Sequence, residues 1–289
     1  MRIGNLDGRL TLFHDGGAVD VEQASGGTFS SDPQAVYGRW DEFCRWAARQ
    51  PGTPQPYSPE KLGPPAPRPE QVFGIGANYR GHAAEGGLEV PEWPMVFTKY
   101  VSSFAAPNGV VTLPTDTVDW EVELVVVVAR TAYHVPPERG WDYVAGLTLG
   151  QDLAERTTQL LGQLPQMSMG KSFPGFSPTG PFLVTPDEFD DPGDLQISCL
   201  LNDDVVQKAS TAELVHSVPM LIGELSSVLP LSPGDVIFTG TPEGVGTTRK
   251  PPRYIQPGDV LVSRLEGVGE MRQTFVAAYR QTPSSRKDV

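Results

Sequence analysis

The chain has 289 residues, of which 35 are acidic and 22 are basic, so its formal net charge at pH 7 is −13. This charge argues against nucleic acid or an anionic membrane as a partner, because binding to either requires clustered lysine and arginine. No apolar run approaches the roughly 20 residues of a membrane-spanning helix, and the first residues lack the apolar stretch of a signal peptide, so the expected location is the cytoplasm.

Residues 1–50 predict a small N-terminal α+β domain. Within residues 1–13 the Asp7-Gly8 turn separates two short strands, and apolar positions at helical spacing predict a helix over residues 37–49. Residues 51–69 contain eight prolines, which are too many for a helix or a central strand. This segment therefore predicts a stiff, proline-rich linker.

Residues 70–281 predict one β-rich α+β domain, in which short apolar runs alternate with glycine and proline. Residues 282–289 are polar and predict a flexible tail. The expected helices cover residues 154–161 and 213–228. The expected strands cover residues 71–75, 110–113, 121–129, 143–151, 182–185, 195–201, 235–239 and 259–264.

Two glutamates open the most apolar predicted strand. Side chains alternate along a strand, so Glu121 and Glu123 lie on one face and Val122 on the other. Asp152 follows the predicted strand 143–151, at a junction where functional residues often lie. Three carboxylates without a nearby histidine or cysteine predict a hard-cation site, for which Mg²⁺ fits best and Mn²⁺ or Ca²⁺ are alternatives. A solvated acidic strand face is the competing interpretation.

A histidine and a glutamate follow a glycine-rich turn. His82 and Glu85 are three residues apart, so one helical turn places their side chains next to each other. A carboxylate that orients an imidazole is what a general base for water requires, although a surface ion pair has the same spacing. Lys171 lies in another glycine- and proline-rich loop, where it predicts either a partly buried cation beside an anionic substrate or a surface lysine.

In their order and spacing, these segments resemble the fumarylacetoacetate hydrolase family from about residue 71 to residue 276, with a looser match for the N-terminal residues. The similarity rests on six segments, which are Gly76-Ala77-Asn78-Tyr79-Arg80-Gly81-His82-Ala83-Ala84-Glu85, Phe97-Thr98-Lys99, Val118-Asp119-Trp120-Glu121-Val122-Glu123, Asp152 with Arg156 and Gln159, Gly170-Lys171-Ser172-Phe173, and Pro233-Gly234-Asp235-Val236-Ile237-Phe238-Thr239-Gly240-Thr241-Pro242.

The resemblance implies a β-sandwich-like roll that assembles as a homodimer. It implies that the divalent metal is held by Glu121, Glu123 and Asp152. It assigns catalysis to His82, Glu85 and Lys171. It implies a substrate pocket lined by Tyr79, Lys99, Arg156, Gln159 and Thr241. Two departures from the common family pattern, Pro174 and Tyr100-Val101, border this pocket and bear on which substrate it accepts.

Such a site implies chemistry on 2-oxo acids or β-dicarbonyl compounds. By the resemblance, the metal stabilises an enolate while a nearby carbon–carbon bond breaks. Attack by water gives hydrolysis of an acylpyruvate- or fumarylacetoacetate-like compound, which the complete His–Glu pair favours. Loss of a carboxylate gives decarboxylation, and reprotonation gives isomerisation of a 2-hydroxy-diene-dioate. A catalytically silent member that binds a metal or a small acid is a further alternative, whereas a nuclease requires a basic surface that this composition does not provide.

Overall fold

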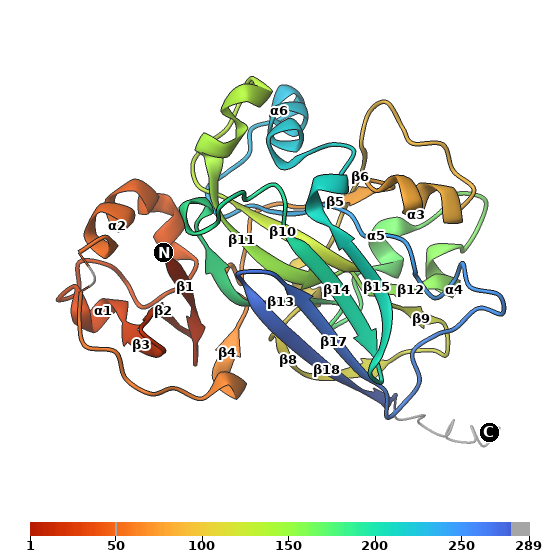
Figure 1. Cartoon of the computed structure of the whole chain (residues 1–289), viewed down its shortest axis with the longest axis horizontal. Coiled ribbons are helices and arrows are strands. Elements are labelled where there is room, and N and C mark those ends of the chain that lie inside the picture. The colour runs from red at the N-terminus through yellow and green to blue at the C-terminus, as the bar shows by residue number, and fades with distance from the viewer. Residues whose placement is uncertain (50, 279–289) are drawn as a thin grey trace, which may run out of the picture.

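The computed structural model describes residues 1–49 and 51–278 and has an α+β fold dominated by sheets (Figure 1), as predicted. The predicted tail, residues 282–289, and the last three residues of the predicted main domain lie outside the described residues. The strands are β1 Arg2–Leu6, β2 Arg9–His14, β3 Gly17–Asp20, β4 Leu62–Gly63, β5 Val72–Gly76, β6 Met95–Thr98, β7 Phe104–Ala105, β8 Asn108–Leu113, β9 Val118–Asp119, β10 Val122–Val128, β11 Val144–Gln151, β12 Ala154–Glu155, β13 Ser177–Val184, β14 Gln196–Leu201, β15 Asp204–Ser210, β16 Val236–Phe238, β17 Val260–Leu265 and β18 Gly269–Ala277.

Most helices are short. Helices α3, α4 and α5 gather at the end of the molecule opposite the N-terminal elements (Figure 1). None of the described helices is both long and apolar enough to cross a membrane. The α-helices are α1 Val21–Ala24, α2 Trp40–Ala47, α3 Arg80–Glu85, α4 Arg156–Gln159, α5 Met167–Gly170 and α6 Val218–Val228, and the 3₁₀ turns are Ala35–Arg39, Pro59–Lys61, Val101–Ser103, Pro137–Tyr143, Pro186–Glu188 and Thr211–Glu213.

Two large sheets organise the fold. The 11-stranded sheet has the order β3-β2-β1-β13-β11-β10-β16-β5-β6, with β4 paired to β1 and β7 paired to β13. Strand β10 is antiparallel to β11 and β16, whereas β16 and β5 are parallel. The second sheet has the order β15-β14-β17-β18-β8, and β12 and β9 form a separate pair.

Strand β10 is buried on both faces, because its apolar side chains alternate between two hydrophobic cores. Leu124 and Val126 belong to the larger core, which is shared with the five-stranded sheet. Val125 and Val127 belong to a second core, which is shared with the N-terminal residues. Burial of each such side chain contributes about 1.5–3 kcal/mol. The face of β10 that carries Val125 and Val127 also carries Glu123. The N-terminal elements therefore cover the part of this face that lies next to the acidic residues.

The N-terminal residues form the predicted strands β1 and β2 and the predicted helix α2. Both residues of the Asp7-Gly8 turn have the left-handed backbone that tight hairpins need, with φ of 54° and 79°. Strand β1 pairs with β13, so these residues extend the main sheet. The proline-rich segment 51–69 includes β4, which also pairs with β1. The predicted linker is therefore anchored on the sheet at this strand.

Some predicted elements have other bounds. The strand predicted over residues 182–185 overlaps the end of β13, which begins at Ser177 even though its earlier part contains prolines. The helix predicted over residues 213–228 begins only at Val218, because Pro219 fits the first turn of a helix and not its interior. Helix α4 is also shorter than the predicted 154–161.

Candidate active site

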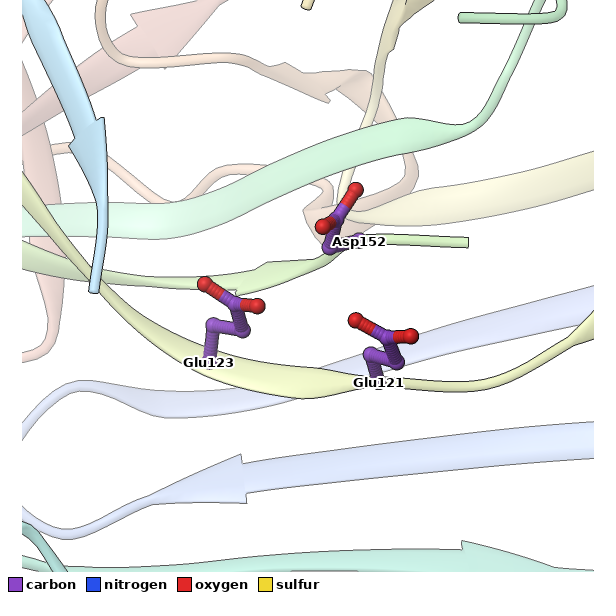
Figure 2. Close-up of side chains that lie close together, drawn as sticks. All are labelled: Glu121, Glu123 and Asp152. Atoms are coloured by element: carbon purple, nitrogen blue, oxygen red, sulfur yellow. The ribbon is translucent and has the colours of Figure 1, made fainter. Parts of the chain in front are cut away.

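Strand pairing brings three carboxylates together. Glu121 directly precedes β10, Glu123 is its second residue, and Asp152 follows the antiparallel neighbour β11, where Gln151 pairs with Val122. The backbone amide of Asp152 donates to the carbonyl oxygen of Glu121 at 2.8 Å. Each acid offers a carboxylate oxygen within 4.8 Å of the other two, and all three residues are buried. Figure 2 shows the three carboxylates on the same side of the two strands. They therefore lie close enough for one ion.

Two of the three carboxylates are paired with buried cations. The ammonium of Lys171 donates to Glu121 at 2.6 Å and also to Asp152. A guanidinium nitrogen of Arg156 lies 2.8 Å from the other oxygen of Glu121. Burial alone raises the pKa of Glu121, but these two cations outweigh burial and lower the pKa to about 2. Glu121 is therefore a carboxylate at neutral pH.

Lys99 lies behind Asp152, and its side chain has no exposed surface. Its ammonium donates to the carboxylate of Asp152 and to the backbone carbonyls of Lys171 (2.5 Å) and Phe176 (3.3 Å). A buried charge needs such partners, because its desolvation costs several kcal/mol. The sequence analysis assigned Lys99 to the substrate pocket, whereas its observed contacts suit a residue that fixes the carboxylate of Asp152.

Glu123 has no ion pair among the residues that the structure describes. Its carboxylate accepts a hydrogen bond from the backbone amide of Gly240 at 2.8 Å. Gly240 has φ of 104°, and a Cβ atom there would lie 2.7 Å from the Cβ of Asn78, so glycine lets this amide approach. Burial and then the charge of Asp152 raise the pKa of Glu123 well above its usual range. A divalent cation would provide the charge compensation that this carboxylate lacks.

The hydroxyl of Tyr79 is buried and has no hydrogen-bond partner in the described part of the chain. Burial and then the nearby carboxylate of Glu123 raise the pKa of this phenol. The hydroxyl thus lies within electrostatic reach of Glu123. Because buried hydroxyls are normally paired, this one indicates a place for a ligand group that the chain itself does not supply. The acidic residues and this hydroxyl together fit a metal with a small ligand.

Helix α3 pairs His82 with Glu85, as their spacing predicted. Nδ1 of His82 lies 2.8 Å from one carboxylate oxygen of Glu85. The other oxygen accepts hydrogen bonds from the amide of Gly244 (2.9 Å) and the hydroxyl of Thr248 (3.0 Å). Burial raises the pKa of Glu85, but these hydrogen bonds outweigh it and lower the pKa. A positive charge on the imidazole would lower the pKa of Glu121, so the pair lies within electrostatic reach of the acidic residues.

The last two predicted pocket residues are buried and bind other protein groups. The amide oxygen of Gln159 accepts a hydrogen bond from Arg156 at 2.8 Å. The hydroxyl of Thr241 donates to the backbone carbonyl of Val122 at 2.9 Å and accepts from Gln207 at 2.8 Å. Gln159 therefore lies beside the acidic residues, whereas Thr241 lies against β10. A role of either residue in binding substrate stays a prediction.

Two residues to which the sequence pattern assigned no role support this site. Asp119 is buried and accepts two hydrogen bonds from Arg156, at 2.7 and 3.0 Å. The side chain of Gln151 accepts from the backbone amide of Glu121 at 2.9 Å. Asp119 belongs to the same alternation as Glu121 and Glu123, so that signal was available. No local pattern distinguishes Gln151.

The chain matches the sequence model of the family described as fumarylacetoacetate (FAA) hydrolase C-terminal over residues 71–276. A curated relative, the human mitochondrial oxaloacetate tautomerase FAHD2A, is 40% identical over 207 residues. That alignment covers 71% of this chain and 66% of the human protein, so the chain spans about two thirds of the length of this relative.

Two solved structures are similar over 96% of this chain and 100% of their own. A protein from Mycobacterium smegmatis, provisionally named HpcE, is 50% identical and has a TM-score of 0.92. Maleylpyruvate hydrolase from Sphingobium sp. SYK-6, solved with manganese(II) and pyruvate, is 28% identical and has a TM-score of 0.76.

Proposed function

The chain belongs to the fumarylacetoacetate hydrolase family, and from this premise we propose that it is a divalent-metal-dependent enzyme for 2-oxo acids or β-dicarbonyl compounds. The observation that supports this most is the buried Glu123 carboxylate, which has no cation partner in the described chain beside two acids that have one. The manganese and pyruvate held by the Sphingobium hydrolase support the same class of ligand.

We assign the metal to Glu121, Glu123 and Asp152, with Mg²⁺ as the first choice and Mn²⁺ or Ca²⁺ as alternatives. A bound divalent cation would supply a Lewis acid that withdraws electron density from the 2-oxo oxygen. The surrounding charges favour an anionic substrate, because four carboxylates, three cationic side chains and a divalent ion leave a net charge of +1. These side chains are Asp119, Glu121, Glu123, Asp152, Lys99, Arg156 and Lys171.

Lys171 and Tyr79 are the groups that we propose bind the substrate. An ammonium has three donors, and Lys171 uses two of them on Glu121 and Asp152, which leaves one for a substrate oxygen. The unpaired hydroxyl of Tyr79 offers a second donor. Arg156 has its donors directed at protein partners, so we assign it to orienting Glu121.

His82 is the proposed general base. Its Nδ1 is bonded to Glu85, which keeps the proton on that nitrogen and stabilises the imidazolium cation. Nε2 can then accept a proton from water. The resulting hydroxide adds to the distal carbonyl carbon, the carbon–carbon bond breaks, and its electron pair passes to the 2-oxo acid as an enolate that is then protonated.

Hydrolytic carbon–carbon cleavage of an acylpyruvate- or fumarylacetoacetate-like compound is the reaction we favour, because a carboxylate-oriented imidazole suits activation of water. Tautomerisation of a 2-oxo acid such as oxaloacetate is the second candidate, favoured by the human relative. In that reaction the imidazole would move a proton between carbon and oxygen. Decarboxylation would give the enolate of a shorter 2-oxo acid, and isomerisation of a 2-hydroxy-diene-dioate would pass through its conjugated dienolate.

The test compares two substrates on one variant. Turnover of an acylpyruvate and decarboxylation of oxaloacetate are measured with Mg²⁺, with Mn²⁺ and with EDTA. His82→Ala is expected to lower hydrolysis by about 10²–10⁴-fold, whereas decarboxylation needs no activated water and should keep most of its rate. His134→Asn is the matched control, because His134 is exposed with φ of 53°, a backbone that asparagine tolerates.

The outcomes separate the alternatives. Equal losses on both substrates would remove the water-activating role from His82. Rapid enol–keto exchange of oxaloacetate without cleavage of any acylpyruvate would support the tautomerase. A folded protein that binds metal but turns over none of these compounds would support the silent family member.

We also propose a homodimer. Met95 and Val96 of the edge strand β6 are exposed, as are Leu164 and Met169 on either side of the start of α5, which contacts β6. Clustered apolar side chains on a surface suit self-association. Sedimentation velocity at micromolar concentration should give about twice the mass of one chain, and a monomer would contradict the proposal.

A further inference from the structure

A loop at residues 244–248 holds the carboxylate of Glu85 from the side opposite His82. The amide of Gly244 and the hydroxyl of Thr248 donate to the same oxygen of Glu85, at 2.9 and 3.0 Å. The other oxygen binds Nδ1 of His82 at 2.8 Å. With both oxygens bound, the plane of the carboxylate is fixed, and so is the direction of the hydrogen bond to the imidazole.

The same loop is fixed to the acidic residues. The backbone amides of residues 246 and 247 donate to Asp119 at 2.7 and 3.0 Å, and Asp119 in turn binds Arg156. Arg156 lies 2.8 Å from Glu121. One loop therefore connects the histidine pair on α3 with a proposed metal ligand, Glu121, at the start of β10.

The loop has little room to shift. Gly244 has φ of 105°, and a Cβ atom there would lie 2.1 Å from the backbone carbonyl of Val206. A Cβ atom at Gly246 would lie 1.9 Å from the carbonyl of Arg253. Such distances allow only glycine, so the backbone passes close to its neighbours at both positions. A rigid support of this kind holds a functional group in place better than a mobile one.

We propose that Thr248 is a positioning residue that sets the orientation of the His82–Glu85 pair. Its hydroxyl lies 3.0 Å from Glu85 and 3.1 Å from the carbonyl of Val245, and the charged acceptor gives the stronger hydrogen bond. Thr248 is also the one loop residue whose contact with Glu85 comes from a side chain. The inference rests on the proposed role of His82, and substitution of this side chain can test it without changing the backbone.

The first experiment measures kcat and KM for the acylpyruvate with three variants. Thr248→Val keeps the shape of the side chain and removes the hydroxyl, so kcat should fall about tenfold while KM changes less than about twofold. Thr248→Ser keeps the hydroxyl and should restore most of the rate. Thr247→Val removes a neighbouring hydroxyl, whose contact is the Tyr254 hydroxyl at 3.5 Å, and should behave like the unchanged protein.

A double-mutant cycle separates positioning from general loosening of the loop. In a Glu85→Gln background, Thr248→Val should change kcat by less than about twofold, because its partner carboxylate is already altered. Independent effects of the two substitutions would overturn the proposal, as would a Thr248→Ser variant that is no better than Thr248→Val.

Hydrogen exchange tests the contact without relying on turnover. The amides of residues 83–88 should exchange about tenfold faster in Thr248→Val than in Thr248→Ser or Thr247→Val, because α3 loses a connection to the loop. Equal exchange in all variants would overturn the positioning role. Faster exchange in a protein that cleaves none of the tested substrates would support the contact while rejecting the proposed reaction.

Discussion

Replacing Glu123 with glutamine separates two effects on stability, which are the cost of burying an acid when no metal is bound and the gain when a metal is bound. In the metal-free protein, Glu123 is a buried acid without an ion pair in the described chain, next to Glu121 and Asp152. The raised pKa of Glu123 means that the metal-free fold at neutral pH favours uptake of a proton by this carboxyl, which costs stability; Glu123→Gln keeps the shape of the side chain and removes this cost. We therefore expect the variant to be more stable than the unchanged protein in EDTA and less stabilised by added metal.

The magnitude follows from the spacing of the carboxylates. Two unit charges 4.8 Å apart repel each other by about 3 kcal/mol at an effective dielectric constant of about 20. Lys171 offsets part of this repulsion and uptake of a proton by Glu123 limits the remainder, so we expect Glu123→Gln to raise the free energy of unfolding in EDTA by about 1–3 kcal/mol. Metal at about 100 times its Kd should raise the free energy of unfolding of the unchanged protein by about 2.7 kcal/mol, and that of the variant by much less.

Urea denaturation with EDTA and with saturating Mg²⁺ or Mn²⁺ measures both quantities. Glu270→Gln is the matched control, because Glu270 forms a half-exposed pair with Arg264 at 2.8 Å and its loss should change stability by less than about 0.5 kcal/mol. If Glu123→Gln lowers stability in EDTA, or if its metal-dependent gain equals that of the unchanged protein, the assignment of Glu123 as a ligand is wrong.

Two further predictions concern residues that support the site. Lys99→Met should lower the free energy of unfolding by about 1–3 kcal/mol, because Asp152 loses one of its two buried ammonium partners and keeps the other, Lys171, whereas Lys61→Met in an exposed pair should cost less than about 0.5 kcal/mol; urea denaturation of both variants checks this. Hydrogen bonds from Thr117 and neighbouring groups outweigh burial and lower the pKa of Glu155 from 4.5 to about 2. A carboxyl whose pKa is lowered in the folded state stabilises the fold at any pH above its ordinary pKa. This contribution is lost as pH falls from about 4.5 towards 2. Glu155→Gln should therefore cost about 1–3 kcal/mol at pH 7 and less at pH 3, and an equal cost at both values would contradict the assignment.

Local patterns were sufficient where the structure is locally regular. Alternation along β10 placed Glu121 and Glu123 on one face, and helical spacing placed His82 next to Glu85. The position of Asp152 required knowledge that β10 and β11 are neighbours, which alternation does not provide and which the family resemblance supplied. The hairpin of β14 and β15 could have been predicted, because asparagine and aspartate tolerate the left-handed backbone of a tight hairpin turn, and Asn202 and Asp203 both adopt it.

The buried state of Lys99 had no local signal. Its acceptors are Asp152 and two backbone carbonyls, one of which is 72 residues away in the sequence. The support of Glu85 by Thr248 likewise joins residues that are 163 positions apart. Such contacts depend on the packing of the whole domain, so a single sequence identifies the catalytic groups more readily than the residues that hold them.

The pairing of β1 with β13 sets an order of events during synthesis. Arg2 and Ile3 pair with Val184 and Leu183, so about 180 residues must be added before this part of β1 is covered, whereas Asn5 and Leu6 pair earlier with β4. At ordinary translation rates the wait is about 10–40 s. During that time the first strand presents unpaired backbone groups, which other strands can bind. A chain that stops before β13 would keep this edge open and would be prone to association with chaperones or with other unfinished chains.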